Sequence, residues 1–468
     1  EDVSDYMGLW MRQDGDAPNL AFVSMQPRRV RGTNGWAEYS ISMPRHVDAT
    51  RLVFGVLIGG TGKVWADDLQ LFVDGKPVWE APRATREPTP MSRDHEFDAG
   101  SRIVIRTVTP AQVENLVLLG KVWGFLKYHH PSVTAGTRHW DYDLLRVLPA
   151  VLAAPDRSAG AVVMQTWVEG LGALPPCDPC ITMRDDNLQL RPRLDWIESD
   201  TRLGPVLADG LSAIHRARPN GQQFFVSQVP GVGNPRFPNE PAYPRLTFPD
   251  AGFQLLALFR FWNIVEYWFP YRHQLDGDWD RVLAEFVPRI ALAPDKDAYQ
   301  LEMIRLIARV TDTHANLWSA PPGLRPPGGD CQLPVTVRFV ENRAVVTGYS
   351  DASAGPTTGL KPGDVIDSLD GVPVEQLVSR WEPFYPASNR PTRLRDMARA
   401  MSRGACTETG VGVRRAGKDL RITARRQPLA SLDASAGMKH DRPGEAFQIL
   451  VGEVAYLKLS SSQAAQAA

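Results

Sequence analysis

The first hundred residues alternate short apolar runs with turn-forming residues, a pattern that is typical of β structure. Apolar and polar positions alternate in part along these runs, and Gly, Pro, Asp and Asn separate them. The β-rich runs are 37–43, 51–58, 69–73 and 102–108. Asp74-Gly75 is a strong signal for a hairpin turn. The pattern predicts a β-sandwich over residues 1–106.

From about residue 110 the apolar positions recur at three- and four-residue steps, as they do along one face of a helix. A second stretch of the same kind begins near Leu255, and the two match without a gap at an offset of 139 residues. The matches include Trp123 with Trp262, Pro131 with Pro270, Trp140 with Trp279, and Pro149 with Pro288. Agreement at Trp and Pro in one register predicts a duplicated helical unit, with copies at 107–180 and 251–320 and a connecting segment at 181–250.

After a linker rich in Pro and Gly at 320–330, β-rich runs return. They are 335–340, 344–349, 365–369, 411–414 and 420–424. Pro362-Gly363 predicts a tight turn and Asp370-Gly371 a hairpin, whereas 375–404, rich in Arg and aromatic residues, predicts a helical insertion. We therefore expect a β domain over 331–428. The run 454–459 then predicts one more strand, and Ser460 the start of a helix.

Length and charge narrow the classes of protein. A chain of 468 residues is too long for one core, so we expect three or four domains. The net charge of -1 gives no reason to expect a nucleic acid or an anionic membrane as partner. No apolar run approaches the roughly 18–20 residues of a membrane span. Because Glu1 rather than Met comes first, we expect a removed signal peptide and a periplasmic or secreted protein, although a shortened chain would look the same.

The four cysteines favour disulfides or inert thiols over a metal or redox site. Cys177 and Cys180 form a CxxC, whereas Cys331 and Cys406 are isolated. A zinc site would need a second close pair, and a thioredoxin-type motif would open a helix, whereas prolines crowd this pair. We therefore predict no metal and no cofactor. Disulfides would suit an oxidising compartment.

Three segments later in the chain occur in an informative order. Residues 312–318 read DTHANLW, residues 359–366 read GLKPGDVI and precede Asp370-Gly371, and residues 452–459 read GEVAYLKL. In this order they resemble the C-terminal-processing (tail-specific) and tricorn-core family of serine peptidases. The resemblance covers about 110–468 and implies a PDZ-like domain at 331–428, followed by the first strand and helix of an α/β peptidase domain at 447–468. The fold class we expect is multidomain α+β.

The resemblance makes His314 the general base and Thr313 its supporting neighbour. A serine hydroxyl is a poor nucleophile until a base takes its proton, and imidazole titrates near neutrality. The tricorn branch usually has Ser before this His, so Thr313 departs from the pattern, and a His that only caps the helix end is the alternative. No GxSxG motif appears, so we expect the chain to stop before the nucleophile and to be inactive alone. Ser–His–Glu and Ser–Lys chemistry both stay open.

The resemblance therefore implies a serine endopeptidase that captures peptides or unfolded proteins through its PDZ-like module. A non-catalytic peptide- or glycan-binding scaffold is the alternative. Residues 60–71, GTGKVWADDLQL, resemble a jelly-roll or galactose-binding-like sandwich, which makes a glycan a candidate partner of residues 1–106.

Overall fold

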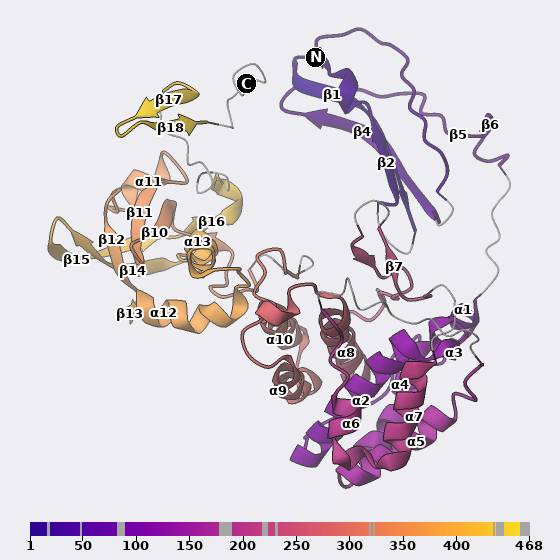
Figure 1. Ribbon diagram of the computed structural model, residues 1–468. Helices are drawn as coiled ribbons and strands as arrows, with labels where there is room; N and C mark the ends of the chain where they lie inside the picture. The colour runs from indigo at the N-terminus through magenta and orange to yellow at the C-terminus, as the bar shows by residue number, and fades with distance from the viewer. Residues whose placement is uncertain are drawn as a thin grey trace. The chain divides into compact units, whose positions relative to one another are not determined.

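The protein is a mixed α/β chain with several sheets and thirteen α-helices among its described residues (Figure 1). The computed structural model describes residues 1–15, 19–46, 49–81, 89–176, 190–217, 223–229, 233–317, 320–321, 323–433, 436 and 444–458. These residues form two compact units, Glu1–Phe269 and Pro270–Ala468. The multidomain α+β expectation is thereby confirmed at the level of mixed α/β structure.

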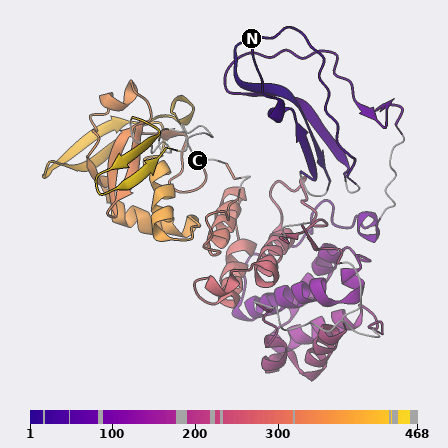
Figure 2. The same cartoon turned by 45° about the horizontal axis from the view of Figure 1, so that its top comes forward.

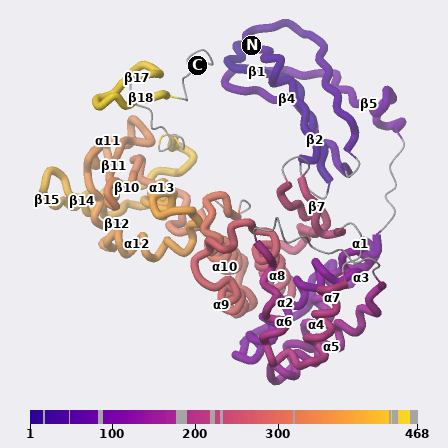
Figure 3. The backbone as a smooth tube through the Cα atoms, in the orientation of Figure 1, coloured from indigo at the N-terminus to yellow at the C-terminus, as the bar shows by residue number. Residues whose placement is uncertain are grey.

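The first unit begins with an antiparallel sheet built around one long strand, β1 (Val3–Asp14). One edge of β1 pairs with β2 (Ala21–Ser24) and β3 (Val30–Gly32), and the other with β4 (Arg51–Gly59). Strands β1, β2 and β4 are labelled in Figure 3. A separate hairpin joins β5 (Phe72–Val73) to β6 (Lys76–Pro77). Its turn is the predicted Asp74-Gly75, with φ of 49° and 77°. The sheet confirms β structure here, whereas a two-sheet sandwich stays a prediction.

Two of the strands expected in this part are wrong. Segments 37–43 and 102–108 contain no strand. The edges of β1 are occupied by β2, β3 and β4, and 37–43 joins no ladder. The start of the second segment binds a helix end instead, because the Ser101 hydroxyl and the Arg102 amide both donate to the carboxylate of Asp250, at 2.5 and 2.9 Å.

The rest of the first unit is mainly helical. Its helices are α1 (Pro90–Arg93), α2 (Pro110–His129), α3 (Pro131–Thr134), α4 (Trp140–Ala153), α5 (Arg157–Glu169), α6 (Trp196–Ser199), α7 (Pro205–Arg216) and α8 (Ala251–Trp268), with a short pair β7 (Ser227–Gln228) and β8 (Pro235–Arg236). Thr109 and Gln112 form a capping box that starts α2. Helices α2 and α8 pack closely, because a Cβ on Gly124 would lie 1.8 Å from the Asn263 side chain.

The second unit starts with helices and continues with a sheet. The helices are α9 (Trp279–Ala291), α10 (Lys296–Ala308), α11 (Ala354–Thr357), α12 (Val374–Trp381) and α13 (Arg390–Ala400). The strands are β9 (Cys331–Gln332), β10 (Val335–Val340), β11 (Arg343–Tyr349), β12 (Val365–Leu369), β13 (Val372–Pro373), β14 (Glu408–Arg415), β15 (Lys418–Arg425), β16 (Gln427–Pro428), β17 (Phe447–Leu450) and β18 (Val454–Leu457). The main sheet has the order β10-β11-β12-β14-β15, and its strands lie side by side in the orange and yellow part of Figure 2.

The predicted elements of this unit agree closely with the structure. Strands β10 and β12 have the expected bounds, and α12 and α13 form the expected helical insertion. Asp370-Gly371 turns between β12 and β13 with φ of 49° and 80°. Strand β18 lies where the run 454–459 predicted one and pairs with β17. The expected helix from Ser460 lies outside the described residues.

The helices of the two predicted copies recur at the expected spacing. Helix α4 begins at Trp140 and α9 at Trp279, and each contains a proline, Pro149 or Pro288. Helices α5 and α10 follow in the same way, each with an aspartate at its N-cap. The division between the units falls inside the second predicted copy, since α8 belongs to the first unit and α9 and α10 to the second.

Helix α10 belongs to the same hydrophobic core as the sheet of the second unit. Ile304 is 1% exposed and joins a buried cluster with Val335 of β10, Val346 of β11 and Met397 of α13. Burial of such side chains is the main driving force for packing. The chain segment that directly follows α10 therefore begins close to the β domain.

Candidate functional site

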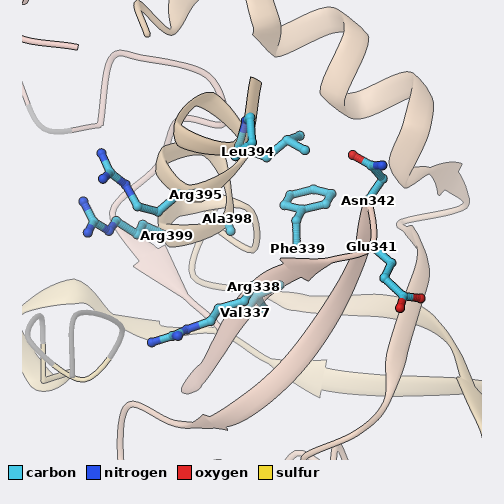
Figure 4. Close-up of a pocket in the computed structure, with 10 residues that line it drawn as sticks. Val337, Arg338, Phe339, Glu341, Asn342, Leu394, Arg395, Ala398 and Arg399 are labelled. Atoms are coloured by element: carbon cyan, nitrogen blue, oxygen red, sulfur yellow. The ribbon is translucent and has the colours of Figure 1, made fainter. Parts of the chain in front are cut away.

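A groove lies between strand β10 and helix α13 in the second unit (Figure 4). Its volume is about 440 Å³. The lining residues are Val337, Arg338, Phe339, Glu341, Asn342, Pro391, Leu394, Arg395, Ala398 and Arg399. Strand β10 is at the edge of the sheet and pairs only with β11 among the described strands. An edge strand offers backbone N–H and C=O groups to an added chain, and here a helix forms the facing wall.

Local sequence signals explain why α13 forms this wall. Asn389 caps the helix, because its side chain accepts a hydrogen bond from the Thr392 amide at 2.9 Å, and a proline occupies the first turn. Leu394, Met397 and Ala398 follow at helical spacing and are buried. The buried stripe packs α13 on β10 and leaves Arg395 and Arg399 exposed.

One end of the groove is held by a disulfide between Cys331 and Cys406. Beside it, Cys331 and Gly404 exchange backbone hydrogen bonds of 3.2 and 2.9 Å, and the Gln332 side chain donates to the carbonyl of Arg399 at 3.0 Å. The C-terminal end of α13 therefore lies near the start of β10, and helix and strand run in opposite directions. The disulfide interpretation is confirmed for these two cysteines, whereas Cys177 and Cys180 lie outside the described residues.

His314 lies in a turn that follows α10. The helix ends at Ala308 with Arg309 as its C-cap, so the alternative that His314 caps the helix is wrong. Asp312 Oδ1 accepts a hydrogen bond from the His314 amide at 2.8 Å and lies 3.1 Å from ring atom Nδ1. A carboxylate at Nδ1 favours a proton there and leaves Nε2 as the basic nitrogen. The side chain of His314 is 97% exposed, so a substrate could reach it.

Thr313 holds this turn in place rather than contacting the imidazole. Its Oγ1 lies 3.3 Å from Ser388 Oγ and accepts a hydrogen bond from the Ser388 amide at 3.3 Å. Ser388 immediately precedes the N-cap of α13. The structure therefore places the His314 turn next to the segment that leads into the groove helix.

Two arginines stabilise the same region through aromatic rings. The Arg305 guanidinium lies 4.4 Å from the centre of the Phe384 ring, and that of Arg325 lies 5.2 Å from the Tyr385 ring. Arg325 also donates to the side chain of Asn316. Burial lowers the pKa of Arg325 and raises the pKa of Tyr385 to about 12, so neither group changes charge near neutral pH.

Sequence reasoning proposed His314 as a site residue, and that stays a prediction; it did not identify Asp312 as the partner of the ring, Ser388 as the contact of Thr313, or the residues of the groove. Asp312 was visible in the DTHANLW segment, two positions before the histidine. The apolar residues at 394, 397 and 398 also carried a helical signal. Ser388 is 75 residues from Thr313, so only the tertiary fold brings them together.

The first unit contains a different concentration of charge, which we call the buried ionic cluster: Lys127, Asp141, Glu240, Tyr243 and Arg260. Lys127 pairs with Glu240, Arg260 pairs with Asp141, and the Tyr243 hydroxyl donates to Asp141 at 2.6 Å. Burial lowers the pKa of Lys127, with Glu240 and Asp141 opposing the shift. Burial would raise the pKa of Asp141, but Arg260 and Lys127 hold it below its usual range. Lys127 and Asp141 are 1% and 3% exposed, and the ion pairs link α2, α4 and α8.

Neither a metal-binding group of side chains nor a membrane-spanning helix is found among the described residues. Within them, no group of three or more His, Cys, Asp and Glu side chains could hold a metal ion. No helix in the same part of the chain has both the length and the apolar character to cross a membrane.

Comparison with known proteins adds little to this site. No protein-family model matches the sequence. One stretch of 66 residues, 14% of the chain, is 36% identical to an uncharacterized HTH-type transcriptional regulator, YbfP, of Bacillus subtilis (strain 168). The match spans 22% of that protein, which is too small a share to assign a family.

Proposed function

We propose that the second unit captures extended peptides in the groove between β10 and α13. The observation that carries the proposal is an edge strand with a helix facing it across a lined groove. A peptide would continue the sheet beyond β10 through main-chain hydrogen bonds, and its alternate side chains would enter the groove. On this proposal residues 331–428 are a PDZ-like domain, as the resemblance of GLKPGDVI implies.

The GLKPGDVI segment itself braces this domain. Asp364 Oδ2 accepts a hydrogen bond from the Lys361 amide at 2.8 Å, and the carboxylate pairs with the Arg415 guanidinium at 2.6 Å. Asp364 is 1% exposed, and its hydrogen bond from Arg415 is the main reason that its pKa lies below the usual range. The motif therefore supports the domain from within, while binding is assigned to β10 and α13.

We further propose that peptide capture serves a serine-type peptidase in which His314 is the general base. His314 Nε2 would take the proton of a serine hydroxyl as the oxygen attacks the peptide carbonyl, and would return it to the leaving amine. Asp312 would keep Nδ1 protonated and stabilise the imidazolium. The proximity of Ser388 to Thr313 supports this role, since a peptide leaving the groove at the start of α13 would pass this segment.

One observation favours the second candidate, a peptide-binding scaffold without catalysis. Among the described residues the His314 ring contacts Asp312 and no serine hydroxyl. A glycan ligand for the N-terminal sheet rests on the sequence resemblance alone. The extracytoplasmic location also stays a proposal, with the Cys331–Cys406 disulfide as its support.

The direct test is to bind a fluorescein-labelled peptide of about eight residues, long enough to pair with β10, and to follow amide hydrogen exchange. We expect slower exchange of β10 amides and weaker binding when alternate peptide amides are N-methylated, because methylation removes the ladder donors. Phe339→Ala should weaken binding. Phe447→Ala, which changes an exposed phenylalanine on β17, should not. Equal binding of the N-methylated peptide would reject strand addition.

A further inference from the structure

We infer that the groove selects peptides in which acidic side chains flank an apolar anchor. The inference rests on the proposed peptide capture and adds the chemical class of the ligand. The base of the groove is apolar: Val337 is 7% exposed, Leu394 5% and Ala398 3%. Phe339 packs against the same core from the strand side. An apolar side chain of the peptide is therefore the matching anchor.

The rim of the groove carries more cations than anions. Arg395 and Arg399 leave α13 on the same side, and Arg338 comes from β10 across the groove (Figure 4). Glu341, at the β10–β11 turn, is the one acidic residue that lines the groove. Its carboxylate already has a cationic neighbour, because Arg343 Nη2 lies 3.3 Å from Oε2.

One carboxylate next to the groove is shared between both helix arginines. Asp396 Oδ1 lies 2.9 Å from Arg395 Nε and 3.2 Å from Arg399 Nη1. A single negative charge cannot neutralise two guanidiniums, so the helix side keeps a net positive charge. The arginine side chains are 46% and 36% exposed, which leaves donors accessible to a peptide carboxylate.

The test uses three labelled peptides that share their apolar positions and carry Glu, Gln or Lys at the alternate positions. Fluorescence anisotropy at low salt should rank their affinities Glu above Gln above Lys, with about a two- to fivefold gain for each arginine engaged. The preference should shrink at high salt, because exposed charges are screened. In the double variant Arg395→Gln, Arg399→Gln the advantage of the Glu peptide should shrink to the about two- to fivefold that Arg338 alone can supply.

The matched control is Arg421→Gln on β15, at the opposite edge of the sheet, which should keep the full preference. An unchanged melting temperature checks that the double variant is folded. Equal affinity for Glu and Gln peptides in the unmodified protein, or a preference that is undiminished in the double variant, would overturn the inference and leave peptide capture standing. Failure of all three peptides to bind would instead reject the proposed function, and the inference with it.

Discussion

The buried ionic cluster of the first unit and His314 of the second lie in opposite surroundings. In the first unit, the buried ionic cluster holds Lys127 and Asp141 away from solvent, and burial shifts the pKa of the lysine. In the second unit, His314 is almost fully exposed and has one carboxylate beside it. The larger pKa shifts therefore belong to side chains that are mostly buried, whereas the proposed general base is exposed to solvent.

This contrast shows that a perturbed pKa alone does not identify a functional site. Perturbed groups are enriched at active sites, but buried ion pairs between helices shift pKa values by the same physics. Here the exposure of the side chain to solvent distinguishes the candidate site residue from the buried ion pairs. Buried charges must be paired to be tolerated, whereas an exposed histidine is tolerated without any partner, so its Asp312 contact is informative.

The largest effect expected is on catalysis. In a preparation that hydrolyses peptides, His314→Ala should lower kcat by about 10²- to 10⁴-fold, because the general base is removed. Peptide affinity in the groove and the melting temperature should stay unchanged. The control is His273→Ala, another histidine of the second unit. Full activity of His314→Ala would favour the scaffold alternative.

The next largest effect concerns the stability that the buried ionic cluster gives to the first unit. Lys127→Met should destabilise the first unit by about 3–5 kcal/mol, because it leaves Glu240 and Asp141 short of a cation in a buried site. Urea unfolding followed by tryptophan fluorescence measures it, since Trp123 lies under the Lys127 ammonium, 4.6 Å from the ring centre. Lys76→Met, at an exposed position, should change stability little. A loss below about 1 kcal/mol for Lys127→Met would mean that the cluster is not held together by this charge.

Removal of the disulfide should act on the second unit. The double variant Cys331→Ser, Cys406→Ser opens a cross-link between residues 75 positions apart, and we expect a loss of about 2–4 kcal/mol. Peptide affinity should fall as well, because the bond fastens one end of the groove. Differential scanning calorimetry should show the transition of the second unit moving while that of the first stays in place. A shift of both transitions would contradict independent units.

The smallest effect concerns acid stability of the first unit. Burial alone would raise the pKa of Asp200, but hydrogen bonds from Arg202 and Arg157 lower it to about 2. A carboxyl group with a depressed pKa in the folded state stabilises above its unfolded value near 4, and the contribution is lost as pH falls toward 2. After allowance for solvent screening this amounts to about 1 kcal/mol. Asp200→Asn should reduce stability at pH 7 by this amount and flatten the loss below pH 4, which acid titration followed by circular dichroism would show.

The sequence predicted the second unit better than the first. Strand β10 begins with alternating buried and half-buried positions, and β12 runs into the strong turn Asp370-Gly371, so local signals and tertiary packing agree. Segment 102–108 has similar β propensity, but its start binds the end of α8 instead. That contact joins Ser101 to a residue 149 positions away, and no local pattern encodes it.

The candidate site was predictable only where its residues are neighbours in the chain. His314 and Asp312 share one short segment, so the family resemblance could point to the histidine. The groove forms from β10 and α13, which are about fifty residues apart in the chain, and the Cys331–Cys406 disulfide joins the segment before β10 to the segment after α13. Such pairings follow from the path of the whole chain, which single-sequence patterns do not specify.

The packing of α10 into the core of the β domain limits how this protein can be taken apart. The composition of the linker at 320–330 indicates a domain boundary at which the chain could be divided. Ile304 precedes this linker, however, and is buried in the core of the sheet that follows it. A cut there would expose the apolar floor beneath β10 and remove the support of the histidine turn. Recombination that moves the peptide-binding module into another protein would therefore have to include α10. The segment that must move as a whole is longer than the β-rich part of the sequence.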